Sequence, residues 1–185
     1  MSTAPRGGIL FRYTPGVGRV AAIDCCGASG TTSPTATCAT AYSTVDQTFT
    51  HGTAAVVAHD TVSFSYGITV TTGSDAKFTV PATGVYKIIP SIQYIGSSGN
   101  AALTIWLRVN GTNVADTSTY TVVKNAEEGV ITCEYLLEMN AGDNVQVCAL
   151  ATTQNVIVNY ISGGGSGANA YPAAPGVITN MYRIR

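Results

Sequence analysis

The sequence predicts an all-β domain, built as a sandwich or a barrel. Threonine occurs 26 times and glycine 20 times among the 185 residues, together with many valine, isoleucine and tyrosine residues. Threonine, valine, isoleucine and tyrosine suit a pleated, half-buried surface, whereas glycine supplies turns. Short runs of alternating apolar and polar residues are separated by turn residues at intervals of about ten positions. A helical period is absent, so the strands form one sandwich or barrel rather than an α/β fold.

The strands are predicted to follow one another at short intervals from about Val45 to the C-terminus. The longest clean alternation, 130–139, places Ile131 and Met139 on one face and the polar residues on the other. In the run 85–94 the proline at position 90 predicts an edge strand or a bulge, because proline cannot donate to the ladder. The expected strands are 53–57, 61–64, 68–71, 78–80, 85–94, 101–109, 113–115, 119–123, 130–139, 145–150, 156–161 and 177–185.

Residues 1–44 have no core pattern and are predicted to form an N-terminal arm, followed by one domain over residues 45–185. An arm laid over a neighbour is one reading of this segment, and a flexible tail is the other. Its opening lacks an apolar stretch long enough for a secretory signal, and no later stretch can span a membrane. The chain is therefore predicted to be made in the cytosol, unless a signal peptide has been removed.

Charge and cysteine content argue against several classes of function. Nine basic and ten acidic residues give a net charge of −1, without the basic excess that nucleic-acid binding requires. The scarcity of charge indicates either a surface that partners cover or a surface whose polar groups are mainly hydroxyls and amides. Five cysteines cannot all pair within one chain, and Cys25, Cys26 and Cys38 lack a second ligand cluster for zinc. We expect free thiols, with no metal and no cofactor.

No group of residues predicts catalysis, so we expect the chain not to be an enzyme. Neither His51 nor His59 has a nucleophile in a suitable setting, and the glycine-rich stretches lack the pattern of a phosphate loop. Asp143 is more typical of a turn cap than of a paired carboxylate site. The sequon that begins at Asn110 is predicted to be only a hairpin turn, because Asn-Gly tolerates positive φ at both positions.

Three motifs in order resemble the C1q/TNF-like jelly rolls. The first joins Phe78-Thr-Val-Pro to Thr-Gly84-Val-Tyr86, a strand, a corner and a second strand. The second is Trp-Leu-Arg-Val followed by Asn110-Gly111, a strand that leads into a tight turn. The third is Leu-Leu-Glu-Met-Asn-Ala-Gly142-Asp143-Asn-Val-Gln-Val. Together these motifs cover roughly residues 45–185, and they are more specific than any one of them alone.

The resemblance implies a single two-sheet jelly roll that assembles most often as a trimer. The chain departs from the secreted members, since it lacks a collagen-like stalk and a signal peptide, and its last strand ends Asn-Met-Tyr-Arg-Ile-Arg. A Thr/Gly/Ala-rich chain with an irregular arm is more similar to the small single-jelly-roll proteins of virus particles, particularly those of large DNA viruses. Jelly rolls serve capsids and lectins alike, so the fold alone does not settle the function.

Trp106 and Arg108 are the candidate residues of an oligomer interface. If Leu103, Ile105 and Leu107 fill the core, strict alternation turns Trp106 and Arg108 outward. An outward tryptophan beside an arginine is typical of interface anchors. The alternative is that the arm, or an edge of the second sheet, covers Trp106 within one subunit.

The sequence therefore predicts a structural protein of a virus particle, a minor capsid or vertex (penton) component. We expect it to form a homo-oligomer, a trimer or a pentamer, and to pack against other capsid proteins in the virion. The alternative is an extracellular C1q/TNF-like binding module that recognises a receptor or a glycan through loops such as 162–176.

Overall fold

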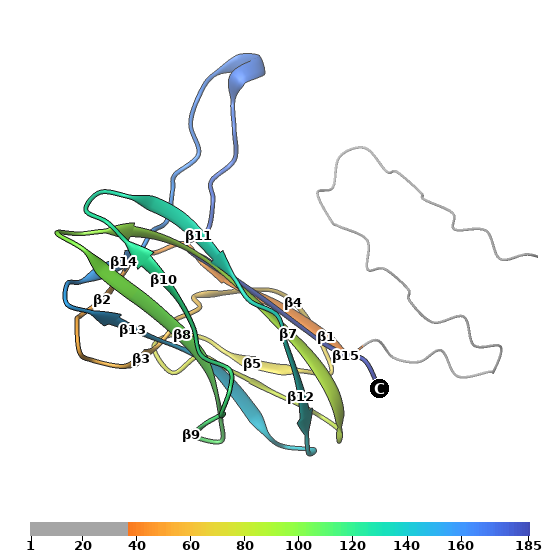
Figure 1. The fold of residues 1–185 in the computed structure, drawn as a ribbon. Coiled ribbons are helices and arrows are strands. Elements are labelled where there is room, and N and C mark those ends of the chain that lie inside the picture. Colours follow the sequence, from red (N-terminus) through yellow and green to blue (C-terminus); the bar gives the residue numbers. More distant parts are fainter. Residues whose placement is uncertain (1–36) are drawn as a thin grey trace, which may run out of the picture. The chain divides into compact units, whose positions relative to one another are not determined.

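The computed structural model describes residues 37–185, which form two antiparallel β-sheets packed face to face (Figure 1). The predicted all-β sandwich is confirmed: the described residues contain fifteen strands and one short 3-10 helix, η1 (Gly167–Asn169). None of their helical segments has the length and apolar character of a membrane span. The architecture is that of a single jelly roll.

The larger sheet, which we call sheet A, has eight strands. Its hydrogen-bonded order is β2, β14, β7, β15, β1 and β4, and both β11 and β12 pair with the opposite edge of β7. The strands are β1 (Cys38–Ser43), β2 (Gln47–Phe49), β4 (Thr61–Tyr66), β7 (Gly84–Gly96), β11 (Glu128–Thr132), β12 (Tyr135–Met139), β14 (Val156–Val158) and β15 (Val177–Arg183).

The smaller sheet, sheet B, has seven strands. Its order is β10, β8, β13, β6 and β5, with β3 paired to β13 and β9 paired to β8. The strands are β3 (Ala55–Val56), β5 (Thr69–Thr71), β6 (Lys77–Thr79), β8 (Ala101–Val109), β9 (Thr112–Asn113), β10 (Thr119–Val123) and β13 (Asn144–Thr152).

The core lies between the two sheets and is filled as the alternation predicts. On β7 the side chains of Tyr86, Ile88 and Ile92 are completely buried, while Lys87, Ile89 and Ser91 are only half-buried. On β11 and β12 the predicted inward residues Ile131 and Met139 are buried. Because successive side chains of a strand point to opposite sides, these buried positions also fix which residues face away from the core.

Pro90 lies in a central strand, so the predicted edge position is wrong. It is paired with Thr179 of β15 on one side of β7. On the other side the ladder is interrupted, because β11 ends at Thr132 and β12 begins at Tyr135, and Pro90 lies opposite this gap. Proline has no N–H to donate, but its carbonyl oxygen accepts the N–H of Cys133 at 3.1 Å. One long predicted strand, 130–139, is therefore two.

The corner between Phe78 and Tyr86 is closed by the tyrosine. Its buried hydroxyl donates a hydrogen bond to the carbonyl of Ala82 at 2.7 Å, which fixes the turn that separates β6 from β7. Position 84 requires glycine, because a Cβ there would overlap the carbonyl oxygen of Arg185. These motif residues therefore fix the corner between the two strands.

The other two motifs meet at one end of the sandwich. Asn110 and Gly111 both have positive φ, 49° and 82°, as the predicted hairpin turn requires. The Asn110 amide donates to Asp143 at 2.7 Å, and the second oxygen of Asp143 accepts the N–H of Asn140 at 2.7 Å, which confirms its role as a turn cap. These hydrogen bonds lower the pKa of Asp143. Gly142, with φ 88°, makes the turn.

The predicted boundary between residues 44 and 45 is wrong. Strand β1 begins at Cys38 and lies within sheet A, between β15 and β4. Its inward residues are Ala39, Ala41 and Ser43, which are too small to give an apolar pattern in the sequence. Residues 1–36, and with them most of the predicted arm, lie outside the described residues.

Candidate interaction surface

Trp106 points away from the core, as the alternation predicts. Its neighbours Ile105 and Leu107 are completely buried in the core, whereas Trp106 lies opposite Cys148 on the outer side of sheet B. The indole is nevertheless only 9% exposed, and its Nε1 donates a hydrogen bond to Oδ1 of Asn113 at 2.9 Å. The side chain is covered within the chain.

Asn113 holds both candidate interface residues. It lies on β9, which the Asn110-Gly111 turn folds back against β8, and its Oδ1 also accepts a hydrogen bond from Nε of Arg108 at 3.3 Å. Trp106 is thus covered in part by Asn113 of the same sheet, and among the described residues this contact comes neither from the arm nor from an edge of the other sheet; a contact of Trp106 with a partner stays a prediction. Arg108 is half-buried, and a contact with a partner remains a prediction for it.

The outer side of sheet A is the larger exposed apolar surface. We call it the sheet A outer face, and it extends from β4 across β15 and β7 to β11 and β12. Val130 and Leu136 are both 59% exposed on it, although each is flanked by buried or half-buried residues of its own strand. Its apolar members are Phe64, Tyr66, Ile89, Val130, Leu136, Ile178 and Tyr182.

Strand register places two of these side chains, Leu136 and Tyr182, on either side of Lys87. Lys87 on β7 pairs with Tyr182 of β15 on one side and with Leu136 of β12 on the other, so the three form one row across the sheet. The Lys87 ammonium lies 2.5 Å from a carboxylate oxygen of Glu134, and the hydrogen bond to Glu134 raises the pKa of Lys87. Lys87 and Glu134 therefore neutralise each other, whereas the exposed Glu128 and Glu138 alternate with Val130 and Leu136 and keep charge on the same side of the sheet.

A smaller apolar patch lies on the outer side of sheet B. It consists of Tyr120 and Val122 on the edge strand β10, where Val122 is 58% exposed. The next residue, Val123, points inward and is completely buried. This patch gives a matched comparison for the sheet A outer face, since Val122 and Val130 differ mainly in the side of the sandwich they occupy.

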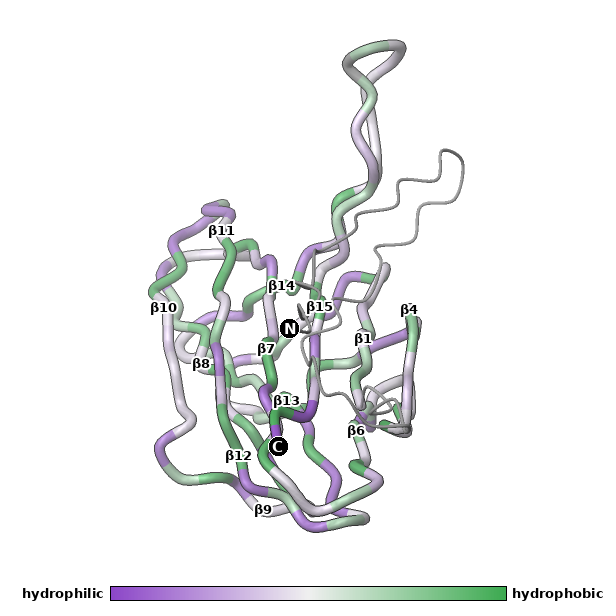
Figure 2. The backbone as a smooth tube through the Cα atoms, turned by 90° about the vertical axis from the view of Figure 1, so that its right-hand side faces the viewer, coloured by the Kyte–Doolittle hydropathy of each residue, from purple (hydrophilic) through white to green (hydrophobic). Residues whose placement is uncertain are grey.

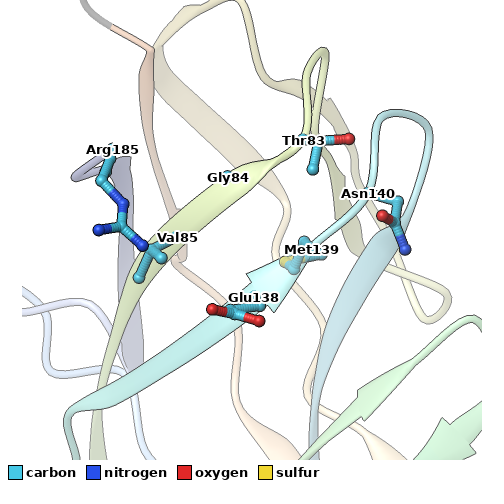
Figure 3. Close-up of a pocket in the computed structure, with 7 residues that line it drawn as sticks. All are labelled: Thr83, Gly84, Val85, Glu138, Met139, Asn140 and Arg185. Atoms are coloured by element: carbon cyan, nitrogen blue, oxygen red, sulfur yellow. The ribbon is translucent and has the colours of Figure 1, made fainter.

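Two of the hollows on the surface lie at opposite ends of sheet A. The larger, about 440 Å³, lies where β7 begins and β12 ends, and Thr83, Glu138, Asn140 and Arg185 are its polar lining residues (Figure 3). The smaller, about 190 Å³, lies at the other end of sheet A and is lined by Gln93, Tyr94, Glu128, Gly129, Val130, Asn159 and Ile161. We call the smaller one the Val130 hollow, because it opens beside that residue.

Within residues 37–185 no three histidine, cysteine or acidic side chains gather as a metal site would require. His59 is buried in the interior, and Asp143 serves a turn. Cys38, Cys133 and Cys148 are free thiols, and burial raises the pKa of Cys148. The arrangement of the described residues is that of a rigid sandwich with one broad apolar face.

Comparison with solved structures places the fold among the C1q/TNF-like jelly rolls. The chain is similar to the globular domain of zebrafish complement 1qA, with 11% identity over 80% of this chain and 98% of that one and a TM-score of 0.52. It is likewise similar to murine APRIL, with 10% identity over 80% and 99% and a TM-score of 0.52. No protein-family model matches the sequence, and no curated protein is similar enough in sequence to match it. At these identities the likeness shows the fold alone, and it confirms the fold that the three motifs predicted.

Sequence reasoning missed Val130, Leu136 and Tyr182 as surface residues of interest. The alternation that turned Ile131 inward also turned Val130 and Leu136 outward, so the signal was present. It was overlooked because an apolar residue in a strand is usually counted toward the core.

Proposed function

We propose that this chain is a non-enzymatic building block that self-associates through the sheet A outer face, as a structural protein of a virus particle. The observation that carries the proposal is an eight-stranded sheet whose outer side presents at least five exposed apolar side chains, with the charge of Lys87 paired to Glu134 among them. Monomeric soluble proteins rarely leave a large contiguous patch of this kind uncovered.

Burial of these apolar side chains would contribute enough free energy to affect association. Complete burial of a valine or leucine side chain contributes about 1.5–3 kcal/mol, so covering Val130 and Leu136 from their present exposure contributes roughly 1–2 kcal/mol each. Phe64, Tyr66 and Tyr182 add aromatic area, which is the kind most enriched in protein interfaces. Because association itself costs several kcal/mol, an interface needs these residues together and not singly.

The role in a virus particle is supported by the resemblance to small capsid jelly rolls and by the sparsely charged surface. In this proposal the rigid sandwiches pack side by side as a trimer or a pentamer and meet other capsid proteins in the virion. Copurification of the chain with intact particles, followed by peptide mass spectrometry, tests that location. Secretion with glycan or cell-surface binding instead would favour the alternative, an extracellular binding module.

The test of self-association uses two matched valines. Val130→Asp places a carboxylate in the sheet A outer face, and we expect sedimentation velocity to show a dissociation constant raised at least about 100-fold. Val122→Asp makes the same change at equal exposure on the outer side of sheet B, and we expect it to leave the oligomer mass unchanged. β-sheet circular dichroism checks that both variants fold. An oligomer that survives Val130→Asp, or a wild-type chain that stays monomeric at high concentration, contradicts the proposal.

A further inference from the structure

The connection between β14 and β15 is an ordered ribbon and not an irregular loop. Ile161 and Ala174 exchange two backbone hydrogen bonds of 3.0 and 2.8 Å, and Gly164 and Tyr171 exchange two more of 3.2 and 2.9 Å. Beyond Gly164 the short helix η1 turns the chain. We call residues 161–174 the projecting hairpin, because two views at right angles show it standing away from the ends of the strands (Figures 1 and 2).

The base of the projecting hairpin is fixed by one residue of sheet A. The Gln93 carbonyl accepts the N–H of Asn159 at 3.0 Å before the hairpin, and the Gln93 N–H donates to the Gly176 carbonyl at 2.8 Å after it. The Gln93 side chain also donates to the carbonyl of Pro175 at 2.6 Å. Both legs are therefore held to β7, which gives the hairpin a defined direction.

The surface of the projecting hairpin suits contact with another protein. No charged residue occurs between Asp143 and Arg183, so the hairpin carries none. Tyr171 lies across the ribbon, with its hydroxyl 2.6 Å from where a Cβ of Gly164 would stand, and it is still 56% exposed. A two-stranded ribbon is marginally stable alone in water, and both of its edges leave backbone groups unpaired. An aromatic ring held in place this way can bind at low entropic cost.

We propose that the projecting hairpin is a clasp that packs on the neighbouring subunit, with Tyr171 as its anchor. This inference rests on the proposed self-association and names a second part of the same interface. Ile161 at the base of the hairpin and Val130 of the sheet A outer face both line the Val130 hollow. A copy seated over Val130 therefore meets the base of the hairpin, and the hairpin continues outward along that copy.

The test shortens the hairpin without disturbing its base. Replacing residues 162–173 by Asn-Gly keeps the Ile161–Ala174 pair and closes it with a two-residue turn. We expect the shortened chain to fold, with a dissociation constant raised at least about 30-fold in sedimentation velocity. Tyr171→Ser should raise it about tenfold, as expected for loss of an aromatic anchor, whereas Tyr120→Ser on the outer side of sheet B should not change it.

A photoreactive phenylalanine analogue at position 171 supplies an independent readout. We expect irradiation of the oligomer to give a covalent dimer whose crosslinked peptide belongs to a second copy of this chain. If Val130→Asp dissociates the oligomer but the shortened hairpin leaves the dissociation constant unchanged and no dimer forms, the clasp is refuted while self-association stands. Crosslinking only to a different protein refutes the clasp as well. If Val130→Asp has no effect, self-association through sheet A fails.

Discussion

The buried histidine His59 makes the stability of the sandwich depend on pH. Its Nδ1 lies 3.1 Å from the carbonyl oxygen of Val57 and its Nε2 lies 2.8 Å from the hydroxyl of Thr179. A carbonyl only accepts, so Nδ1 carries the proton and Nε2 accepts from Thr179 in the neutral ring. Phe78 meets the ring edge to face at 5.6 Å. Burial lowers the pKa of His59 from 6.5 to about 4, against smaller opposing effects of Val57 and Asp60.

The sign and size of the effect follow from this pKa. Between pH 6.5 and pH 4 the unfolded chain binds a proton that the folded chain does not, so the free energy of unfolding falls as the pH falls. One pKa unit corresponds to about 1.36 kcal/mol, which gives a total loss of about 3 kcal/mol by pH 4 and about 2 kcal/mol between pH 7 and pH 5. Asp60 and Asp143, whose pKa values are lowered below 3.8, lose their contributions only at lower pH.

Urea unfolding at pH 7, 6 and 5 measures this loss through the fluorescence of Trp106, the single tryptophan. Protein concentration must be held constant, because self-association also stabilises the folded chain. His59→Gln should lower stability at pH 7 but flatten its dependence on pH, whereas His51→Gln, at an exposed position, should retain the wild-type slope. A wild-type stability that is the same at pH 7 and pH 5 would refute the reasoning.

Three further substitutions test the packing described above. Tyr86→Phe removes the hydrogen bond to Ala82 and should cost about 1 kcal/mol in urea unfolding, with no change in oligomer mass. Gly84→Ala forces Arg185, which follows β15, to move and should cost more than about 1 kcal/mol, seen as a melting temperature lowered by several degrees. Trp106→Ala should cost about 3 kcal/mol in urea unfolding. It should leave the oligomer mass unchanged, because the indole is covered within its own chain. A smaller oligomer would show instead that Trp106 is an interface anchor.

The alternation of the sequence predicted much of the fold, because a strand period assigns each side chain to one face. It placed Tyr86, Ile88 and Ile92 in the core, and the Asn110-Gly111 dipeptide gave the turn. The pattern failed at β1, where alanine and serine fill the inward positions. Burial at these positions depends on the neighbouring strands, which a local window of sequence does not contain.

The interaction surface was harder to predict, for a related reason. Alternation states that Trp106 and Val130 both face away from the core, but not what lies over each of them. Asn113 reaches Trp106 only because a turn folds β9 back along β8, whereas no such segment crosses Val130 among the described residues. The projecting hairpin gave no pattern at all, since its pairing depends on backbone groups and on glycines that carry no hydropathic signal.

The distribution of charge ties the two proposed contacts together. The 39 residues between Asp143 and Arg183 carry no charge, and they comprise β13, β14, the projecting hairpin and β15. Burial explains this for the inward residues of the three strands. It does not explain the outward residues Ile178 and Tyr182, or a hairpin exposed over most of its length, where solubility favours lysine and glutamate. Uncharged residues in both exposed places are accounted for if both are covered by a neighbouring subunit, since charged groups are depleted at the centre of protein interfaces.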